Sequence, residues 1–347
     1  MSTSNTSKQE FLAVLKSVLG ESGSSPIALH EPNIGQRENE LVSKCLASGW
    51  VSSVGEYISE FEQGLAKFTN SKHAIAVVNG TAALHLALHS IGVKPGDEVL
   101  VPTLSFVATA NAVSHCGAIP HFVDSDPETL GLDPLALREH LRANASLRDG
   151  ELHNTSTGRR ISAVVPMHTF GHPMQIEALI DVAKEFNLVV VEDAAESIGS
   201  YVGTTHTGTF GRCSSLSFNG NKTITTGGGG AILTNDAELA QRIRHLATTA
   251  KMPHDYEYNH DAVAFNYRMP NINAALGCAQ LSRLDDFLSA KRVLARKYAE
   301  GFSSARSMQF VAEPHGTTSN YWLNTIRLNK PDLSLRDDLL VAARASG

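Results

Sequence analysis

The sequence predicts an α/β fold with a mainly parallel sheet and helices on both faces, followed by a smaller α+β domain. Short apolar runs of strand character alternate with helical runs between residues 73 and 191. These runs are apolar on both faces, which is typical of strands in a buried parallel sheet. Near residue 240 this alternation ends, and helical segments dominate the rest of the chain.

The elements of the predicted sheet follow a regular order. The first strand, over 73–78, is a short apolar run, and Gly80-Thr81 then opens a helix over 82–91. A strand over 98–101 and a helix over 106–115 repeat the same order. Further elements of this kind are strands over 119–123, 161–166 and 188–191 and a helix over 175–186. Strands separated by helices in this way form parallel sheets.

The C-terminal part is predicted to be mainly helical. Helical spacing covers 238–250, 274–284, 287–302 and 335–345, and one strand is expected over 321–328. Residues 253–273 are rich in His, Asp, Asn and Tyr, which predicts an irregular, exposed segment. We therefore expect an N-terminal helix and linker over 1–26, a large α/β domain over 27–245 and a small domain over 246–347.

Length and composition exclude several classes of protein. The 347 residues suggest two domains, at about 150 residues per domain. Apolar residues make up 42% of the chain and charged residues 18%, which excludes global disorder. The formal net charge of −6 argues against a nucleic-acid partner, because nucleic-acid binding favours a basic excess.

The sequence also predicts a protein of the cytoplasm. No apolar run reaches the length of a membrane helix, about 18 residues. Apolar residues Phe11, Val14, Leu15 and Val18 recur at helical spacing, which predicts a short amphipathic helix rather than a signal peptide. The four cysteines are far apart and form no CxxC motif, so reduced thiols are expected, without a disulfide framework or a zinc site.

Lys222 lies in the window with the most chemical information. It stands between a short strand-like run and the four glycines Gly227 to Gly230. A phosphate-binding P-loop requires Gly immediately before the lysine and a second Gly five residues earlier, but Asn221 and Leu216 occupy these positions. A lysine that forms an imine with an aldehyde cofactor is the other interpretation.

Pyridoxal 5'-phosphate (PLP) is an aldehyde cofactor whose remaining requirements the sequence can meet. Its phosphate favours a helix N-terminus, which the turn at Asn79-Gly80-Thr81 offers. Its pyridine nitrogen favours a carboxylate, and Asp193 follows the strand over 188–191. Ligands of open α/β sheets bind at these carboxyl ends. Phe106, at another turn from strand to helix, could cover the ring.

Five motifs, taken together, resemble the DegT/DnrJ/EryC1/StrS family of nucleotide-sugar aminotransferases. They occur in the family's order and with its spacing, at 79–85, 106–113, 192–196, 217–222 and 266–269. The resemblance runs from about residue 28 to the end of the chain. It implies the fold-type-I aminotransferase fold and a PLP-dependent transaminase. Because family members usually continue past this endpoint, we expect the small domain to be incomplete.

The resemblance also implies roles for four residues around the ring of the cofactor. Lys222 would form the imine and carry the proton, and Asp193 would pair with the pyridinium nitrogen. Phe106 would stack on the ring. Glu196 stands where many relatives have Gln or His, near the 3-hydroxyl group of the cofactor.

Four further residues would hold the phosphate group by the same resemblance. Gly80, Thr81 and Ser217 would bind it within one subunit. Asn266 would reach the phosphate of the neighbouring subunit, which implies a homodimer with shared active sites. No metal ion is expected. His168 and His172 are four residues apart, but Gly171 and Pro173 disfavour the helix that would pair them.

The sequence at residues 195–197 and 219–222 most resembles the LegC-type branch, which aminates UDP-4-keto-6-deoxy-N-acetylhexosamines. The implied reaction transfers an amino group from an amino acid, L-glutamate, to C4 of such a nucleotide-linked sugar. The pathway would be that of a bacterial surface glycan or a nonulosonic acid. Two alternatives stay open: an aminotransferase like GDP-perosamine synthase, and an inactive PLP-binding homologue.

Overall fold

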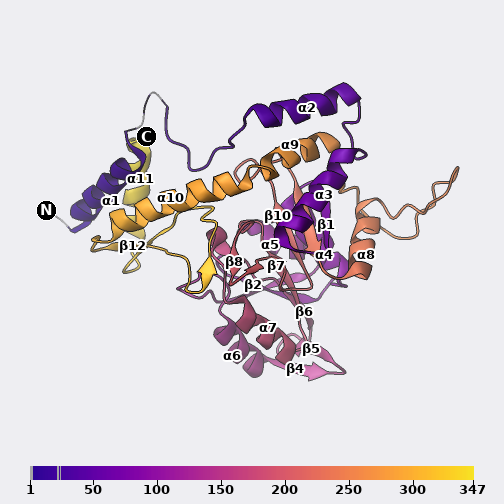
Figure 1. Cartoon of the computed structure of the whole chain (residues 1–347). Coiled ribbons are helices and arrows are strands. Elements are labelled where there is room, and N and C mark those ends of the chain that lie inside the picture. Colours follow the sequence, from indigo (N-terminus) through magenta and orange to yellow (C-terminus); the bar gives the residue numbers. More distant parts are fainter. Residues whose placement is uncertain (1–2, 22, 24) are drawn as a thin grey trace.

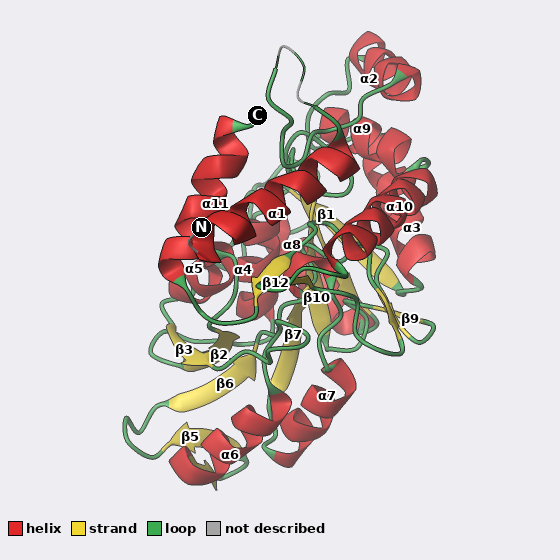
Figure 2. Cartoon of the chain, turned by 90° about the vertical axis from the view of Figure 1, so that its left-hand side faces the viewer, coloured by secondary structure: helices red, strands yellow, loops and turns green. Residues whose placement is uncertain are grey.

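A nine-stranded sheet forms the centre of the molecule (Figures 1 and 2). The computed structural model describes residues 3–21, 23 and 25–347. The strands are β1 (His73–Val77), β2 (Glu98–Pro102), β3 (Ile119–Val123), β4 (Ala145–Arg148), β5 (Glu151–Asn154), β6 (Arg160–Val164), β7 (Val189–Asp193), β10 (Cys213–Ser217) and β11 (Gly230–Thr234). Seven of them lie in the order β1-β11-β10-β7-β6-β2-β3, and the β4–β5 hairpin pairs with β6.

The sheet is mainly parallel, as the sequence predicts. Strands β10, β7, β6, β2 and β3 pair with one another in parallel. Only β11 runs the other way along this path, because it is antiparallel to both β1 and β10. The carboxyl ends of β1, β7 and β10 therefore lie at the same edge of the sheet.

Helices cover both faces of the sheet (Figure 2). The bounds of these helices are α2 (Gln36–Ser48), α3 (Glu56–Thr69), α4 (Gly80–Ser90), α5 (Val107–His115), α6 (Pro134–Asn144), α7 (Ile176–Glu185), α8 (Ala237–Ala247) and α9 (Asn271–Leu281). Alternate residues of β1 show the two faces. Ile75 and Val77 pack in the cluster that contains α4, α5 and α8, whereas Ala74 and Ala76 pack with α2, α3 and α9. Helices α6 and α7 form a third cluster over β2, β6 and β7.

A smaller group of elements lies at one end of the molecule, together with both termini (Figure 1). It comprises α1 (Thr3–Leu19), α10 (Leu284–Phe302), β12 (Met308–Phe310), β14 (Ile326–Leu328) and α11 (Leu333–Ala345). The apolar face of α1 that the sequence predicts packs against Tyr298, Phe302 and Leu339 of α10 and α11. Residues 1, 2, 22 and 24 of the predicted N-terminal helix and linker lie outside the described residues.

The strand expected over 321–328 is wrong in its first half. Only Ile326–Leu328 is a strand, and it pairs with β12. Tyr321 has a φ of 48°, outside the β region. The backbone N–H groups of Tyr321 and Trp322 donate to the side chains of Ser319 and Asn320. Since local side chains satisfy this backbone, it makes no ladder with a neighbouring strand.

The segment between α8 and α9 projects from the body of the molecule (Figure 1). Most of its residues are exposed, including Tyr256 and Tyr258, as the sequence predicts for 253–273. The last three residues of that range are helical instead, because α9 begins at Asn271 immediately after Pro270.

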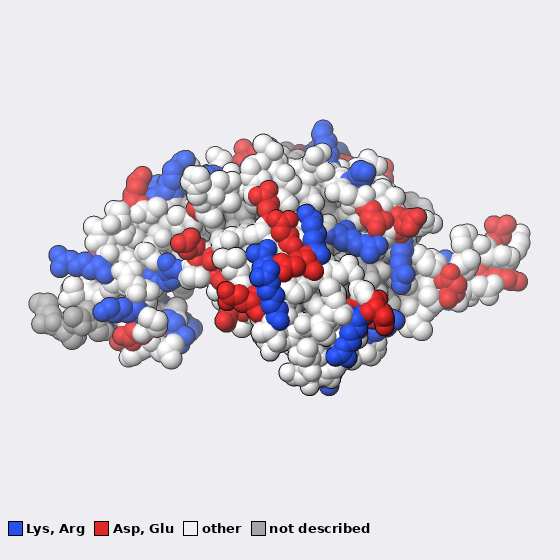
Figure 3. Space-filling view, turned by 90° about the horizontal axis from the view of Figure 1, so that it is seen from below, with Lys and Arg blue, Asp and Glu red and all other residues white. Residues whose placement is uncertain are grey.

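Acidic and basic side chains are intermixed on the face shown in Figure 3, where no extended basic patch is visible. Among the described residues, none of the helices has the length and apolar character that a membrane span requires.

Candidate active site

The edge formed by the carboxyl ends of β1, β7 and β10 gathers most of the residues that the sequence singles out. Asp193 is the last residue of β7, and Ser217 is the last residue of β10. The parallel pairing sets Ser215 opposite Asp193. Helix α4 begins at Gly80, three residues after β1 ends. Ligands of open α/β sheets bind at such an edge.

Lys222 presents its amino group to a buried carboxylate. Its Nζ atom lies 3.4 Å from Oε1 of Glu196, and the exposed fractions of the two side chains are 11% and 3%. The same Nζ atom lies 3.8 Å from the ring centroid of Trp322. Lys222 lies in the turn after β10, where its backbone N–H group donates to the Asn219 carbonyl at 3.0 Å.

Glu196 is held by backbone as well as by the lysine. Its Oε2 atom accepts a hydrogen bond of 2.8 Å from the N–H group of Phe170. Burial raises the pKa of Glu196 above its usual range, although the charge of Lys222 and the Phe170 N–H act in the opposite direction. An amine and a carboxylic group are thus in contact at a position that is largely shielded from solvent.

Asp193 is buried, with three donors around its carboxylate. The hydroxyl group of Thr109 donates to Oδ2 at 2.7 Å. Oδ1 accepts from the Ser215 hydroxyl at 3.4 Å and from the Ala195 N–H at 3.2 Å. These contacts fix the orientation of a negative charge at the sheet edge, which suits a partner that carries a protonated ring nitrogen.

The N-terminus of α4 offers an anion site. The side chain of Asn79 accepts from the Ala82 N–H, and its carbonyl accepts from the Ala83 N–H. The N–H groups of Gly80 and Thr81 are the other donors at this helix end. A Cβ atom on Gly80 would lie 2.8 Å from Cβ of Ser217, so the glycine brings backbone and hydroxyl donors together. Phosphate groups favour such a site.

These three parts fit PLP. The cofactor needs an amine for its aldehyde, a carboxylate for its ring nitrogen and donors for its phosphate. Lys222, Asp193 and the start of α4 would supply these groups from one edge of the sheet.

Phe106 and Asn266, which the resemblance also singles out, are both exposed in the single chain. Phe106 precedes α5, and its side chain is 61% exposed. Its carbonyl accepts from the N–H of Thr109, so it lies one turn from the donor to Asp193. Asn266 is exposed and bonds weakly to Arg268, with Nη2 to Oδ1 at 3.5 Å.

Sequence reasoning missed three residues that border the site. Thr109 could have been found, because it lies within the first turn of the helix that follows Phe106. Trp322 and Asn320 could not, because nothing in the sequence near them indicates a contact with a loop about a hundred residues earlier. His168, which the sequence leaves without a catalytic role, donates from Nε2 to the buried Glu192 at 3.0 Å and has a structural role.

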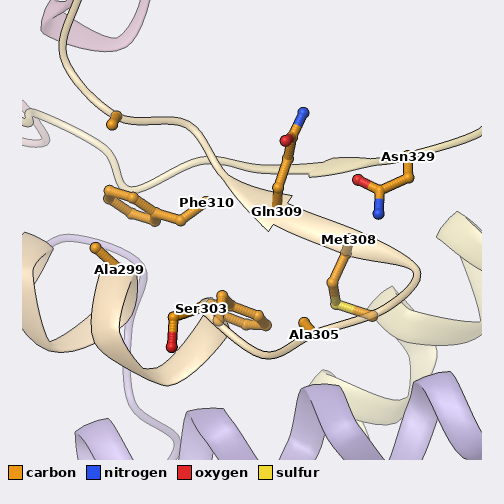
Figure 4. A pocket seen from close by; sticks show the side chains of 9 residues that line it. Ala299, Ser303, Ala305, Met308, Gln309, Phe310 and Asn329 are labelled. Carbon is orange, nitrogen blue, oxygen red and sulfur yellow. The ribbon is translucent and has the colours of Figure 1, made fainter.

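A separate pocket of about 330 Å³ lies between the C-terminal end of α10 and β12 (Figure 4). Phe302, Met308, Phe310 and Asn329 are among its lining residues. None of the residues that the sequence singles out lines this pocket, so it is distinct from the candidate active site.

Comparisons with known proteins agree with this chemistry. The family model of the DegT/DnrJ/EryC1/StrS aminotransferases matches residues 32–347. GDP-perosamine synthase of Caulobacter vibrioides is 39% identical over 92% of this chain and 82% of its own length. GDP-perosamine synthase of Escherichia coli O157:H7 is 41% identical over 86% of this chain and 77% of its own length.

A solved structure gives the same result for the fold. The structure of DesV from S. venezuelae, in complex with a ketimine intermediate, is 30% identical, with a TM-score of 0.77 over 88% of this chain and 77% of its own. The family match and these relatives extend over most of the chain. The protein described here therefore belongs to the DegT/DnrJ/EryC1/StrS aminotransferase family, and it is a PLP-dependent sugar aminotransferase.

Proposed function

We propose that this enzyme transfers an amino group from L-glutamate to C4 of a GDP-linked 4-keto-6-deoxy sugar. The observation that carries the proposal is that Asp193, the start of α4 and Lys222, which contacts Glu196, all lie at or after the ends of strands at one edge of the sheet. The GDP-linked sugar is supported by three relatives named GDP-perosamine synthase, at 38 to 41% identity. The sequence at residues 195–197 and 219–222 favours a UDP-linked N-acetylhexosamine instead. The experiment below distinguishes the two substrates.

Each part of the site has a task in this reaction. Bound PLP supplies an aldehyde that exchanges amines and a ring that accepts electrons. Lys222 holds the cofactor through its Nζ atom and, once released, takes the proton from Cα of the amino donor. Asp193 keeps the ring nitrogen protonated. Gly80, Thr81 and Ser217 hold the phosphate.

Two exposed residues lead us to include a second subunit in the proposal. Phe106 would cover the ring, and Asn266 would reach the phosphate in a partner subunit. Both side chains are exposed in the single chain. Sedimentation of the loaded enzyme would give the oligomeric state, and a monomer would exclude the shared site. A cytoplasmic location also belongs to the proposal, and the four buried cysteines without disulfide bonds support it.

The test follows the two halves of the reaction separately. The enzyme is loaded with PLP, and L-glutamate is added until the long-wavelength absorbance of the lysine-bound cofactor disappears. The amine-loaded enzyme is then given GDP- or UDP-linked 4-keto-6-deoxy sugar. Return of the absorbance only with the GDP-linked sugar supports the proposal. Return only with the UDP-linked sugar supports the other branch. An absorbance that L-glutamate does not remove supports an inactive homologue.

The role of Lys222 has its own control. Borohydride reduction should attach the cofactor to the parent protein but not to a Lys222→Ala variant. Lys184→Ala is a suitable control, because the Lys184 side chain is 72% exposed and pairs with Asp181 at 3.3 Å. Equal labelling of the Lys222→Ala and parent proteins would contradict the assignment.

A further inference from the structure

Trp322 makes three contacts with the surroundings of Lys222. The face of its indole ring lies 3.8 Å from the lysine Nζ atom. Its Nε1–H group donates to the carbonyl oxygen of Asn221 at 2.6 Å, immediately before the lysine. Its own carbonyl oxygen accepts a hydrogen bond of 3.0 Å from Nζ of Lys291 in α10. Trp322 thus contacts both the reactive amine and the loop that carries it.

The segment that carries Trp322 is fixed to the other side of the same site. The side-chain amide of Asn320 donates to the carbonyl groups of Glu196 and Ile198, at 2.8 and 2.9 Å. Its oxygen accepts from the N–H of Trp322 at 2.8 Å. One short segment therefore sets the positions of the indole and of the chain at Glu196, the two groups that the amine contacts.

We propose that Trp322 is a positioning residue for Lys222, which holds the amino group against its ring beside Glu196 when the lysine is not bonded to the cofactor, and most strongly when that group carries a proton. This inference rests on the proposed role of Lys222. An indole face attracts a cation more strongly than the other aromatic rings do, and the attraction grows when the pair is shielded from water. Trp322 is itself buried. The freed amine would then stay next to the place where it must act, instead of sampling other rotamers.

Other titratable groups face this amine. Glu196 lies opposite the indole, and Lys291 approaches through the Trp322 carbonyl. Burial lowers the pKa of Lys291 to about 8. Burial, together with the charges of Lys291 and Lys222, lowers the pKa of His30 to about 4. The test must therefore distinguish the effect of Lys222 on the Trp322 ring from the effects of these three neighbours.

Fluorescence offers a readout that does not depend on activity. The chain has two tryptophans, Trp50 and Trp322, so a Trp50→Phe variant leaves Trp322 as its single indole. In the cofactor-free full-length protein, adding Lys222→Met removes the cation beside the indole, so the emission of Trp322 should shift. Lys291, His30 and Glu196 are the same in both proteins, so the shift reports the lysine. Identical emission with and without Lys222→Met would overturn the proposal.

Two substitutions of Trp322 test the consequence for amine transfer. Trp322→Leu removes the ring, and kcat should fall about tenfold with little change in the KM for the sugar. Trp322→Phe keeps a ring face without the N–H group and should retain most of kcat. Equal losses in both variants, or a change in KM alone, would indicate a merely structural residue. If the parent transfers no amine, the proposed function fails, but the fluorescence test still decides whether Lys222 rests on Trp322.

Discussion

The hydroxyl group of Thr109, in the first turn of α5, donates a hydrogen bond of 2.7 Å to Oδ2 of Asp193 at the end of β7. Both side chains are buried, with exposed fractions of 0% and 2%. A helix on one face of the sheet thus orients the carboxylate at the sheet edge. The ring nitrogen of a bound cofactor would meet a carboxylate that is already held in one orientation.

Thr109→Val should therefore destabilise the protein and slow amine transfer. The substitution keeps the shape of the side chain but removes the donor, and a hydrogen bond to a charged group contributes about 1.5–3 kcal/mol. We expect the free energy of unfolding to decrease by an amount within this range. The rates of both half-reactions should also be lower. Thr109→Ser retains the hydroxyl group and should keep most of the rate. A Val variant as fast as the Ser variant would show that the hydrogen bond is not needed.

Gly80→Ala should weaken the binding of PLP. The added Cβ would lie 2.8 Å from Cβ of Ser217 and 3.1 Å from its Oγ, so the two sides of the proposed phosphate site must separate. Titration of the cofactor-free protein should show a weaker affinity, by about tenfold or more, which corresponds to about 1.4 kcal/mol. Gly228→Ala is the matched control, because a Cβ there meets nothing within 4 Å. Equal affinities in the two variants would exclude a phosphate group at this position.

The sequence predicts the parts of the site that depend on local order. The strand that ends at Asp193 begins within the apolar run over 188–191, and the turn at Gly80 follows an apolar strand directly. Both signals are local, and the structure has both elements at these positions. Strand β10 is harder to predict from the sequence, because Ser214 and Ser215 have little strand propensity. This strand forms because it pairs with β7 on one side and with β11 on the other.

The contacts of Lys222 could not be read from the sequence. Glu196 is 26 residues away along the chain, and their contact depends on β7 and β10 lying side by side. Trp322 is farther still, in a segment that the sequence suggests is a strand. Its side chain reaches the lysine only because Asn320 ties the segment to the backbone at Glu196. Helices α2 and α3 are not among the predicted elements, although both have an amphipathic face.

Glu196→Gln should change how stability depends on pH. The pKa of Glu196 is raised from 4.5 in the folded protein, mainly by burial. As the pH rises, the unfolded chain therefore releases this proton first, and the parent loses stability between pH 4.5 and the raised pKa. Glutamine has no proton to release. The free energy of unfolding of the variant, relative to the parent, should therefore increase as the pH rises from 4.5 through the raised pKa of Glu196.

Chemical denaturation at several pH values would measure this difference. Glu300→Gln is the control, because this carboxylate lies on the exposed side of α10. A difference between the Glu196→Gln variant and the parent that stays constant with pH, like that of the control, would show that folding does not raise the pKa of Glu196.

His172→Leu should protect the protein against acid. Among the described residues, neither ring nitrogen of His172 has a hydrogen-bond partner, and the side chain is 1% exposed. Burial lowers its pKa from 6.5 to about 4. As the pH falls, the unfolded chain takes up this proton before the folded protein does, so stability is lost between pH 6.5 and about 4. The loss attributed to this residue is about 3 kcal/mol.

The leucine variant has no such proton to take up, so its advantage over the parent should grow as the pH falls from about 7 to about 4. At neutral pH neither state takes up this proton, so the two proteins should differ by less. There the leucine variant also lacks the edge-to-face contact with Tyr321, whose ring centroid lies 5.3 Å from that of His172 in the parent. His315→Leu, at an exposed position, controls for the change in composition. Acid unfolding of the three proteins checks the argument: if the His172→Leu curve runs parallel to the parent curve, a partner such as a bound water satisfies the ring and holds its proton in the folded state.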